Sequence, residues 1–245
     1  LCARSNRFCG IDAKVTATLN ELLAHGLVIG IATGRGQSVR KDLAEKIPTP
    51  YHDQVIIGYY NCADIGFLGD TTKPDKKIDV SKPLQKLFAA IEAYDFPAEI
   101  SPELKPNQIT VEIKKESEWT KVRTMIIDLV LSQNLSGIQI LESSHSMDII
   151  DQSMTSKLNV ISHCESLTQQ LGLADACLCI GDKGQWPGND YQLLTSTYSL
   201  SVDEVSSLSE TGWNIAAPGI KNVKASVYYL SCLTYQPNGV TINLL

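Results

Sequence analysis

The chain has 245 residues, a mass of 26.8 kDa, a net charge of −6 at pH 7 and a pI of about 5.2. Its 43% apolar and 20% charged residues are the balance of a globular protein, which excludes disordered, fibrous and coiled-coil classes. Because no basic stripe is present, we predict no nucleic-acid partner. Apolar runs such as residues 27–32 are far shorter than the ~20 residues that span a bilayer, and no signal-peptide pattern opens the chain. We therefore predict no membrane partner and a cytoplasmic location.

The seven cysteines are odd in number and contain no C-x-x-C pair. This usage is typical of small buried side chains in a reducing cytoplasm. The four histidines are scattered along the chain, away from any cysteine cluster, so we predict no zinc site.

The first part of the chain alternates helices and strands. Residues 13–25 have apolar positions at helical spacing, with Asp12 placed as N-cap and Gly26 placed at C′. The apolar run 27–32 predicts a buried parallel strand. A helix over 37–46, ended by Pro48 and Pro50, and a buried strand over 54–60 follow. This alternation predicts a parallel sheet covered on both faces.

The pattern changes between residues 70 and 150. A polar stretch at 69–79 reads as a linker, and Ile109, Val111 and Ile113 then alternate with polar residues, which predicts an antiparallel sheet with one solvated face. We therefore predict an inserted α+β domain over 70–150 within a core domain formed by 1–69 and 151–245. Its expected helices are 81–94 and 118–133, and its expected strands are 109–114, 137–142 and 146–150.

The core pattern resumes after Asp151. A buried strand at 178–180 is expected to run directly into Gly181 and Asp182. The other elements expected here are a helix at 157–171, the start of a helix at 191–195, a strand at 213–216 and a helix at 222–230.

Three places combine strand ends or helix starts with chemistry-bearing side chains. The first is Thr33-Gly34-Arg35, where a hydroxyl and backbone N–H groups at a helix start would make an anion cradle. A simple helix cap with a turn glycine would use the same residues. The second is Lys157, a cation at a helix start, where the helix dipole disfavours it. A solvated surface lysine is the alternative there.

The third place is the strand end Gly181-Asp182 with the loop that leads to Asn189 and Asp190. Carboxylate and amide oxygens that converge at a strand end are ligands of the kind that Mg²⁺ takes. The alternative is a turn in which Asp190 caps a helix.

Taken together, these motifs resemble the haloacid dehalogenase (HAD) superfamily. The order, spacing and insert position are similar to the branch with a cap between its second and third motifs, the Cof-type and sucrose-phosphate-phosphatase-like hydrolases. Thr33-Gly34-Arg35 matches the second motif, Lys157 the third, and Gly181-Asp182 with Asn189-Asp190 the fourth. The resemblance implies an α/β fold with a Rossmann-like, parallel-sheet HAD core and an inserted α+β cap.

The family's opening motif, Asp-x-Asp-Gly-Thr on the first strand, is absent from this chain. In the family its first aspartate is the nucleophile and its second is the general acid/base. Asp12 follows no apolar strand, so we do not assign it as the nucleophile. The fourth motif also departs from the family, because residues 183–188 lengthen the loop between Asp182 and Asn189.

The resemblance implies an Mg²⁺-dependent phosphatase that acts on a small phosphorylated substrate, a sugar phosphate among the options. Thr33 and Lys157 would be catalytic, and Gly34 would assist in substrate binding. Arg35 would either bind substrate or form a structural salt bridge. Asp182 would hold Mg²⁺, with Asn189 and Asp190 completing or orienting the shell.

Three interpretations follow from the absent motif. The chain is a fragment of a complete phosphatase, or another polypeptide supplies the strand, or the protein is a non-catalytic phosphate-binding or sugar-phosphate-binding module. We favour the first, because Thr33, Lys157 and Asp182 are all present. A missing central strand would leave an open apolar slot, so we expect poor stability, self-association or a partner strand at that slot.

Overall fold

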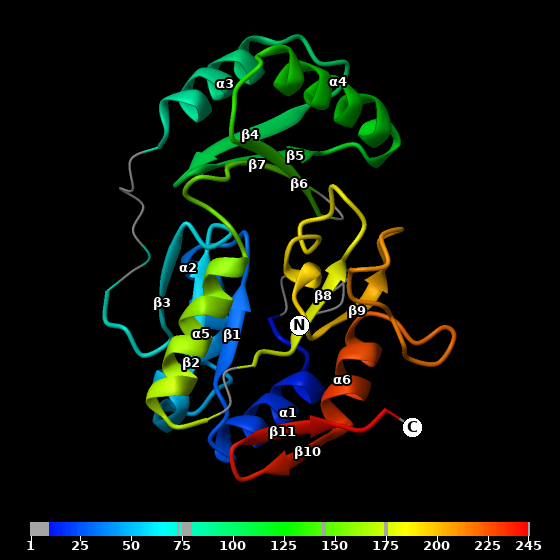
Figure 1. The fold of residues 1–245 in the computed structure, drawn as a ribbon. Helices are drawn as coiled ribbons and strands as arrows, with labels where there is room; N and C mark the ends of the chain where they lie inside the picture. The colour runs from blue at the N-terminus through cyan, green and yellow to red at the C-terminus, as the bar shows by residue number, and fades with distance from the viewer. Residues whose placement is uncertain (1–9, 73, 75–79, 144–145, 174–175, 245) are drawn as a thin grey trace.

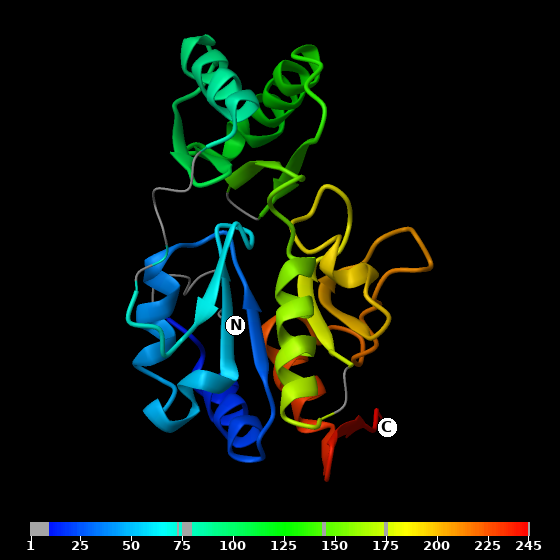
Figure 2. The same ribbon diagram turned by 60° about the vertical axis from the view of Figure 1, so that its left-hand side comes forward.

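The computed structural model describes residues 10–72, 74, 80–143, 146–173 and 176–244. Figures 1 and 2 show a sheet with two helices placed over a larger α/β part, which we call the cap and the core. The connection between β3 and α3 carries the chain from the core to the cap, and the end of β7 returns it to α5.

The first half of the core is a sheet in the order β1-β2-β3. Strands β1 and β2 are parallel, and β3 is antiparallel to β2. Helix α5 packs on β1 and β2, while α1 and α2 contribute to the apolar cluster that contains Ile31 and Ile57. The elements are α1 (Ala13–Ala24), β1 (Ile29–Ala32), α2 (Gln37–Ala44), a 3₁₀ helix (Thr49–Gln54), β2 (Val55–Tyr59), β3 (Asp64–Phe67) and α5 (Leu158–Gln170).

The second half of the core is the parallel pair β8 and β9, with α6 packed on β9. Helix α6 also packs on α1, so the two halves are joined through their helices. The elements are β8 (Cys179–Lys183), a 3₁₀ helix (Leu193–Thr195), β9 (Ser199–Glu204), α6 (Val223–Ser231) and the hairpin β10 (Leu233–Gln236) with β11 (Gly239–Ile242).

The cap is an antiparallel sheet in the order β4-β5-β7-β6. Helices α3 and α4 cover the face that points away from the core (Figure 1). The elements are α3 (Lys82–Ala93), β4 (Ile100–Lys105), β5 (Gln108–Ile113), a 3₁₀ helix (Glu116–Glu118), α4 (Trp119–Ser132), β6 (Ile138–Glu142) and β7 (Ser146–Asp151).

The alternation predicted in the cap is present, but its second face is not simply solvated. Ile109 and Val111 are buried under the helices, and Glu112 is exposed as expected. Thr110 and Asp148, however, are 7% exposed, because this end of the sheet lies against the core. The prediction of one solvated face is therefore wrong at these positions.

Two elements expected in the last third take other forms. Residues 191–195 contain only the 3₁₀ turn Leu193–Thr195, because the Ser- and Thr-rich segment that follows enters β9. Residues 213–216 make a single bridge, from Trp213 to Leu200, and form no strand. The Tyr229 hydroxyl instead accepts hydrogen bonds from the backbone N–H groups of Ile215 and Ala216.

Strand β1 is less buried than its apolar sequence predicts. Ile31 is buried, but Ile29 and Ala32 are half-buried and Gly30 is exposed. The reason is local: β1 pairs with β2 along one edge, and among the described residues no strand pairs with its other edge. The burial of β1 thus depends on whether a strand lies along its second edge, which the sequence of β1 alone does not determine.

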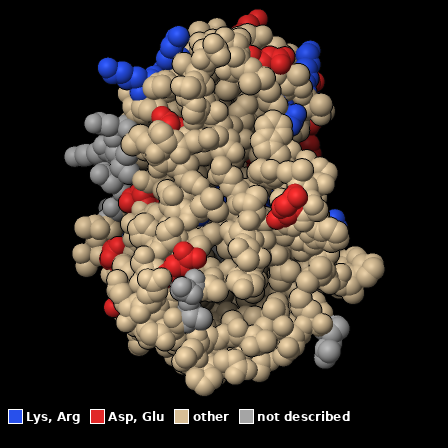
Figure 3. Space-filling model, in the orientation of Figure 1, with Lys and Arg blue, Asp and Glu red and all other residues tan. Residues whose placement is uncertain are grey.

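Charged side chains are spread over the face shown in Figure 3, with Lys and Arg mostly toward the cap. No continuous basic stripe crosses that face among the described residues. None of the described helices has both the length and the apolar character that a membrane span requires.

The five described cysteines are free thiols, and Cys62, Cys164 and Cys179 are buried. Burial raises the pKa of Cys62 and that of Cys179, each to about 11. Because the thiolate is the reactive form, we expect iodoacetamide at pH 8 to alkylate Cys62 and Cys179 much more slowly in the folded chain than after unfolding in urea. Peptide mass spectrometry measures both rates, and equal rates in the two states would contradict this prediction.

Candidate active site

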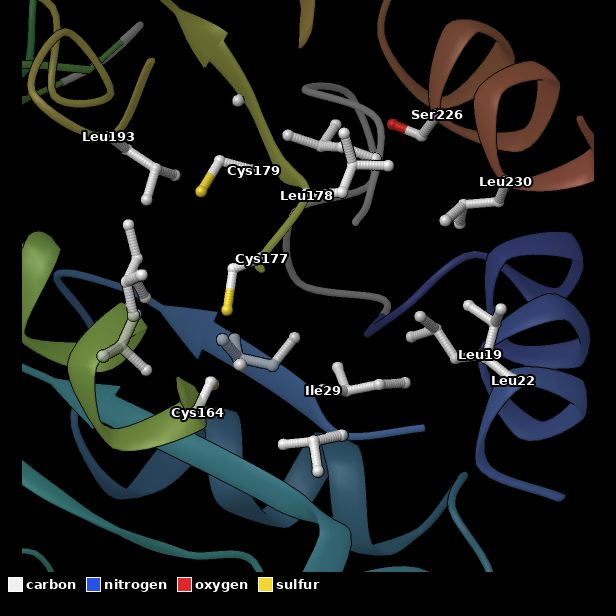
Figure 4. A pocket seen from close by; sticks show the side chains of 18 of the residues that line it. Leu19, Leu22, Ile29, Cys164, Cys177, Leu178, Cys179, Leu193, Ser226 and Leu230 are labelled. Atoms are coloured by element: carbon white, nitrogen blue, oxygen red, sulfur yellow. The ribbon is translucent and has the colours of Figure 1, made fainter. Parts of the chain in front are cut away.

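A cavity of about 940 Å³ lies between β1 and β8. Apolar side chains from both strands and from α1, α5 and α6 line its interior, and Figure 4 shows several of them. Its polar end lies where β1 and β8 finish, at Thr33 and Asp182. All seven candidate site residues predicted from the sequence line this cavity: Thr33, Gly34, Arg35, Lys157, Asp182, Asn189 and Asp190.

Thr33 and Gly34 follow the end of β1. The Thr33 hydroxyl accepts a hydrogen bond from the Arg35 N–H at 3.1 Å, which leaves its own proton free to donate. The Thr33 N–H is committed to Gly58 O in β2, at 3.0 Å. A Cβ on Gly34 would lie 2.8 Å from Asp148 Oδ2 of the cap, so a larger residue here would displace the Asp148 carboxylate.

Arg35 is held within its own segment. Its Nη2 lies 2.7 Å from Asp42 Oδ2, and its Nε donates to Ser38 Oγ at 3.2 Å. The geometry therefore favours the structural salt bridge over a substrate contact, the two roles that the sequence left open.

Lys157 and Asp190 form a buried ion pair. The Lys157 Nζ lies 2.7 Å from Asp190 Oδ1, and the side chains are only 5% and 11% exposed. The other oxygen, Oδ2, accepts the N–H of Asp182 at 2.8 Å. Burial opposes both charges, but the Lys157 ammonium holds the pKa of Asp190 at about 2, and Asp190 in turn raises the pKa of Lys157. Asp190 therefore orients Lys157 and the end of β8 rather than capping a helix.

Asp182 and Asn189 present oxygen atoms to the same cavity. Asp182 is an exposed residue at the mouth of the cavity, where partial loss of hydration and the neighbouring Asp190 carboxylate raise the pKa of its carboxyl group to about 6. The buried Asn189 Oδ1 has no hydrogen-bond partner among the described residues.

These two groups fit a magnesium ion. A carboxyl group destabilised by a neighbouring carboxylate and an amide oxygen without a donor are both oxygen ligands that a cation would satisfy. Mg²⁺ needs only one or two protein carboxylates, because water and substrate phosphate complete its shell. Asp182 and Asn189 are the better-placed ligands, since both Asp190 oxygens are already engaged. No group of three His, Cys, Asp or Glu side chains suited to a metal occurs among the described residues.

Gly181 places Asp190 correctly, because a Cβ at this position would lie 2.7 Å from the Asp190 Cβ and 2.8 Å from its Oδ2. We expect Gly181→Ala to displace Asp190 and to cost about 1–3 kcal/mol of unfolding free energy, the range for overpacked sites. Urea unfolding measures the loss. Gly172→Ala would not serve as the control, because Gly172 has a positive φ at which alanine is strained. The control is Ala176→Gly, which exchanges the same two residue types at an exposed position. A Gly181→Ala variant as stable as the wild type would contradict the packing argument.

The lengthened loop after Asp182 reaches the cap. Glu142 at the end of β6 donates its N–H to Pro187 O at 2.7 Å and accepts the Asn189 N–H at 2.9 Å. Gln192 further along donates to Gln139 Oε1 at 3.2 Å. The extra residues thus connect the candidate metal ligands to the cap.

Sequence reasoning missed a set of polar residues where the cap meets the core. Asn61 lies in the turn after β2, and its Nδ2 donates to Gln108 Oε1 at 2.9 Å and to Asp148 Oδ2 at 3.1 Å. The signal available in the sequence was an acidic residue, Asp148, between the apolar residues Met147 and Ile149. Alternation alone assigns this position to solvent, whereas the structure buries it.

No protein-family model matches the sequence, and a search of curated proteins finds no relative. Solved structures do match. The sucrose-phosphatase from Synechocystis sp. PCC6803, in complex with sucrose and phosphate, has a TM-score of 0.58 at 18% identity over 84% of this chain and 87% of that one. The C-terminal domain of C. albicans trehalose-6-phosphate phosphatase has a TM-score of 0.60 at 12% identity over 87% and 82%.

The IMP-nucleotidase of Plasmodium falciparum has a TM-score of 0.57 at 12% identity over 79% of this chain, which spans only 58% of that protein. These three proteins are named as two phosphatases and a nucleotidase, and at 12–18% identity they show that this chain shares their fold. The fold of this chain is therefore HAD-like, a Rossmann-like core with an α+β cap. The fold predicted from the sequence is confirmed.

Proposed function

We propose that this chain carries the site of an Mg²⁺-dependent phosphatase that hydrolyses a small phosphomonoester. The observation that carries the proposal is the convergence of Thr33, Lys157, Asp182 and Asn189 on the polar end of one cavity. These groups are the parts that phosphoryl transfer needs, because its catalysis consists mainly of positioning and charge neutralisation.

Each residue has a role in this proposal. The Thr33 hydroxyl and the Gly34 N–H donate to oxygens of the phosphoryl group, and the Lys157 ammonium offsets its negative charge. Asp190 fixes the position of Lys157 through their 2.7 Å contact. Asp182 and Asn189 would hold Mg²⁺, which when bound neutralises charge on the phosphoryl oxygens. The cap excludes water from the site.

The nucleophile is expected on a strand between β1 and β8. Among the described residues, the carboxylates that line the cavity are those of Asp42, Asp182 and Asp190. Asp42 is paired with Arg35 and Asp190 with Lys157, so we assign neither as the nucleophile. A strand in the cavity would end between Thr33 and Asp182 and would place a carboxylate beside both. Such a strand would have to be supplied by a longer form of the protein or by a partner, and without it we expect self-association through the apolar slot between β1 and β8.

A sugar phosphate is a fitting substrate, since the sucrose-phosphatase neighbour is in complex with sucrose and phosphate.

The free thiols support the cytoplasmic location proposed from the sequence.

The test is phosphate binding by isothermal titration calorimetry, with and without MgCl₂. We expect binding that requires Mg²⁺ and that Lys157→Ala and Asp182→Ala each weaken at least about tenfold, or ~1.4 kcal/mol. Lys221→Ala is the matched control, because Lys221 is an exposed lysine paired with Asp203. Phosphate binding that both site variants leave unchanged would overturn the assignment.

Catalysis is tested separately with p-nitrophenyl phosphate, after addition of an apolar strand peptide ending in Asp-x-Asp-Gly-Thr. We expect hydrolysis that Asp182→Ala abolishes. A non-catalytic phosphate-binding module is the second candidate, favoured by the pairing of Asp42 and Asp190. It predicts phosphate binding with no hydrolysis, whether or not the peptide is present.

A further inference from the structure

Two cysteines meet in the wall of the cavity between β1 and β8. Cys164 is on the buried face of α5 and is 6% exposed, whereas Cys177 lies just before β8 and is half-buried. Cys177 packs against the apolar cluster that contains Cys164 and Val160, and both cysteines line the cavity. Figure 4 shows the Cys177 side chain directed from the segment that enters β8 toward the helix that carries Cys164. The mechanism proposed above uses neither thiol.

The position of the Cys164 sulfur is set by its neighbours. A Cβ on Gly30 of β1 would lie 2.6 Å from Cys164 Sγ, so a larger residue in the strand would displace the sulfur. On its other side the Cys164 thiol donates a hydrogen bond to the Cys177 sulfur. Because α5 packs on β1 and β2, this contact joins the first half of the core to the chain segment that begins the second half.

The two thiols differ in nucleophilic character. The hydrogen bond from Cys164 lowers the pKa of Cys177, although burial and the charge of Glu165 oppose this change. The same hydrogen bond, together with burial, raises the pKa of Cys164. A partly exposed thiol that ionises readily beside a second, protonated thiol is the arrangement found where cysteines react with peroxide. Cys177 is thus the more nucleophilic member of the pair.

The two other buried cysteines among the described residues are engaged elsewhere. Cys179 has a hydrogen bond with the Ser196 side chain, and Cys62 has one with the backbone of Val160. Burial raises the pKa of each thiol to about 11, so little of the reactive thiolate is present near neutral pH. Cys232 is half-buried like Cys177 and provides an internal reference for exposure alone.

We propose that Cys164 and Cys177 form a site of reversible oxidation, at which a peroxide converts the two thiols into a disulfide. The Cys177 thiolate attacks one oxygen of hydrogen peroxide, so an S–O bond forms, the O–O bond breaks and the departing hydroxide takes up a proton to give water. Cys164 then loses its proton and attacks the Cys177 sulfur, which forms the S–S bond and releases the second oxygen as water. The two thiols lose two electrons, and the peroxide is reduced to two waters.

The disulfide would connect the two halves of the core beside the candidate site. Helix α5 begins directly after Lys157, and β8 carries Asp182. A bond from α5 to the segment that enters β8 therefore restricts how far these two elements can separate. It should also make the folded chain more resistant to heat, because a cross-link restricts the unfolded chain.

The test treats the folded wild-type chain with hydrogen peroxide near neutral pH, blocks the remaining thiols with N-ethylmaleimide and maps the cysteines by peptide mass spectrometry. Trypsin leaves all three cysteines of this region on one peptide, because residues 158–182 contain no Lys or Arg. Cleavage after Glu165 then separates Cys164 from Cys177 and Cys179. A Cys164–Cys177 disulfide holds the two fragments together until dithiothreitol is added.

We expect this disulfide to be the main product and to form at least about tenfold faster than Cys232 is oxidised, because the thiolate is the reactive form. In urea, where the contact between the thiols is lost, the preference should disappear. Cys164→Ser should stop the reaction at the Cys177 sulfenic acid, which dimedone traps, and Cys177→Ser should leave Cys164 reduced. Cys179→Ser, the same change on a neighbouring thiol, is the matched control and should still form the disulfide.

Three results on the wild-type chain would each overturn the proposal, whether or not the variants fold. They are a disulfide from Cys177 to any other cysteine, oxidation of Cys232 as fast as that of Cys177, and the same products in urea as in the folded chain. Calorimetry should show that the oxidised chain melts several degrees higher and that dithiothreitol reverses the shift. The experiment contains no phosphate, so its outcome is independent of the proposed phosphatase function.

Discussion

Replacing Lys157 with methionine should lower the free energy of unfolding by about 3–5 kcal/mol, the usual cost of removing one partner of a buried ion pair. Methionine fills a similar volume, so the loss reports the charge left on Asp190. That carboxylate would stay buried, with Oδ2 still bound to the Asp182 N–H and Oδ1 without a cation. Urea unfolding followed by circular dichroism measures the change.

Two further variants separate the ion pair from simple loss of lysine. Lys221→Met removes a lysine that pairs with Asp203 in solvent, and we expect almost no change in stability. Adding Asp190→Asn to Lys157→Met removes the stranded charge and should recover part of the loss. If Lys157→Met and Lys221→Met had equally small effects, the buried pair would not be a stabilising feature of this core.

Local signals in the sequence predicted much of the core. The Asp12 side chain accepts the Lys14 N–H at the start of α1, and Gly26 adopts a φ of +80° after its end, as the capping pattern predicts. The candidate site could be predicted for the same reason. Thr33 and Gly34 follow β1 and Asp182 lies at the end of β8, and parallel strands bring their carboxyl ends to one edge.

Features that depend on distant neighbours could not be predicted. Strand β4 is absent from the predicted elements. It contains Pro102, which a central strand would not tolerate, but β4 is an edge strand, where a proline is tolerated. Asn61 and Asp148 are 87 residues apart, so no local pattern links them. The partial exposure of β1 likewise depends on what pairs with its open edge.

The open edge of β1 suggests that an added strand should have a large effect on the stability of the chain. Strands β1 and β8 pair with β2 and β9 respectively, and both border the apolar cavity of about 940 Å³. Among the described residues no strand pairs with the second edge of β1 or of β8. An apolar cavity bordered by such edges is costly, because dispersion contacts and backbone hydrogen bonds are both lost. An apolar strand inserted between β1 and β8 would supply both.

We therefore expect a peptide with an apolar strand sequence ending in Asp-x-Asp-Gly-Thr to bind the chain and raise its melting temperature. At a free concentration of 100 times Kd, binding to the folded state alone adds about 2.7 kcal/mol of stability. Differential scanning calorimetry measures the shift, and light scattering should show that self-association of the chain falls as the peptide binds.

The matched control is the same peptide with proline at a central position. Proline removes a backbone donor and clashes with central-strand pairing, so this peptide should neither stabilise the chain nor disperse its associates. A stabilising effect of the proline peptide would show that apolar contact alone, without strand pairing, explains binding. A chain that is monomeric and melts cooperatively at high temperature without any peptide would show that β1 and β8 need no strand between them.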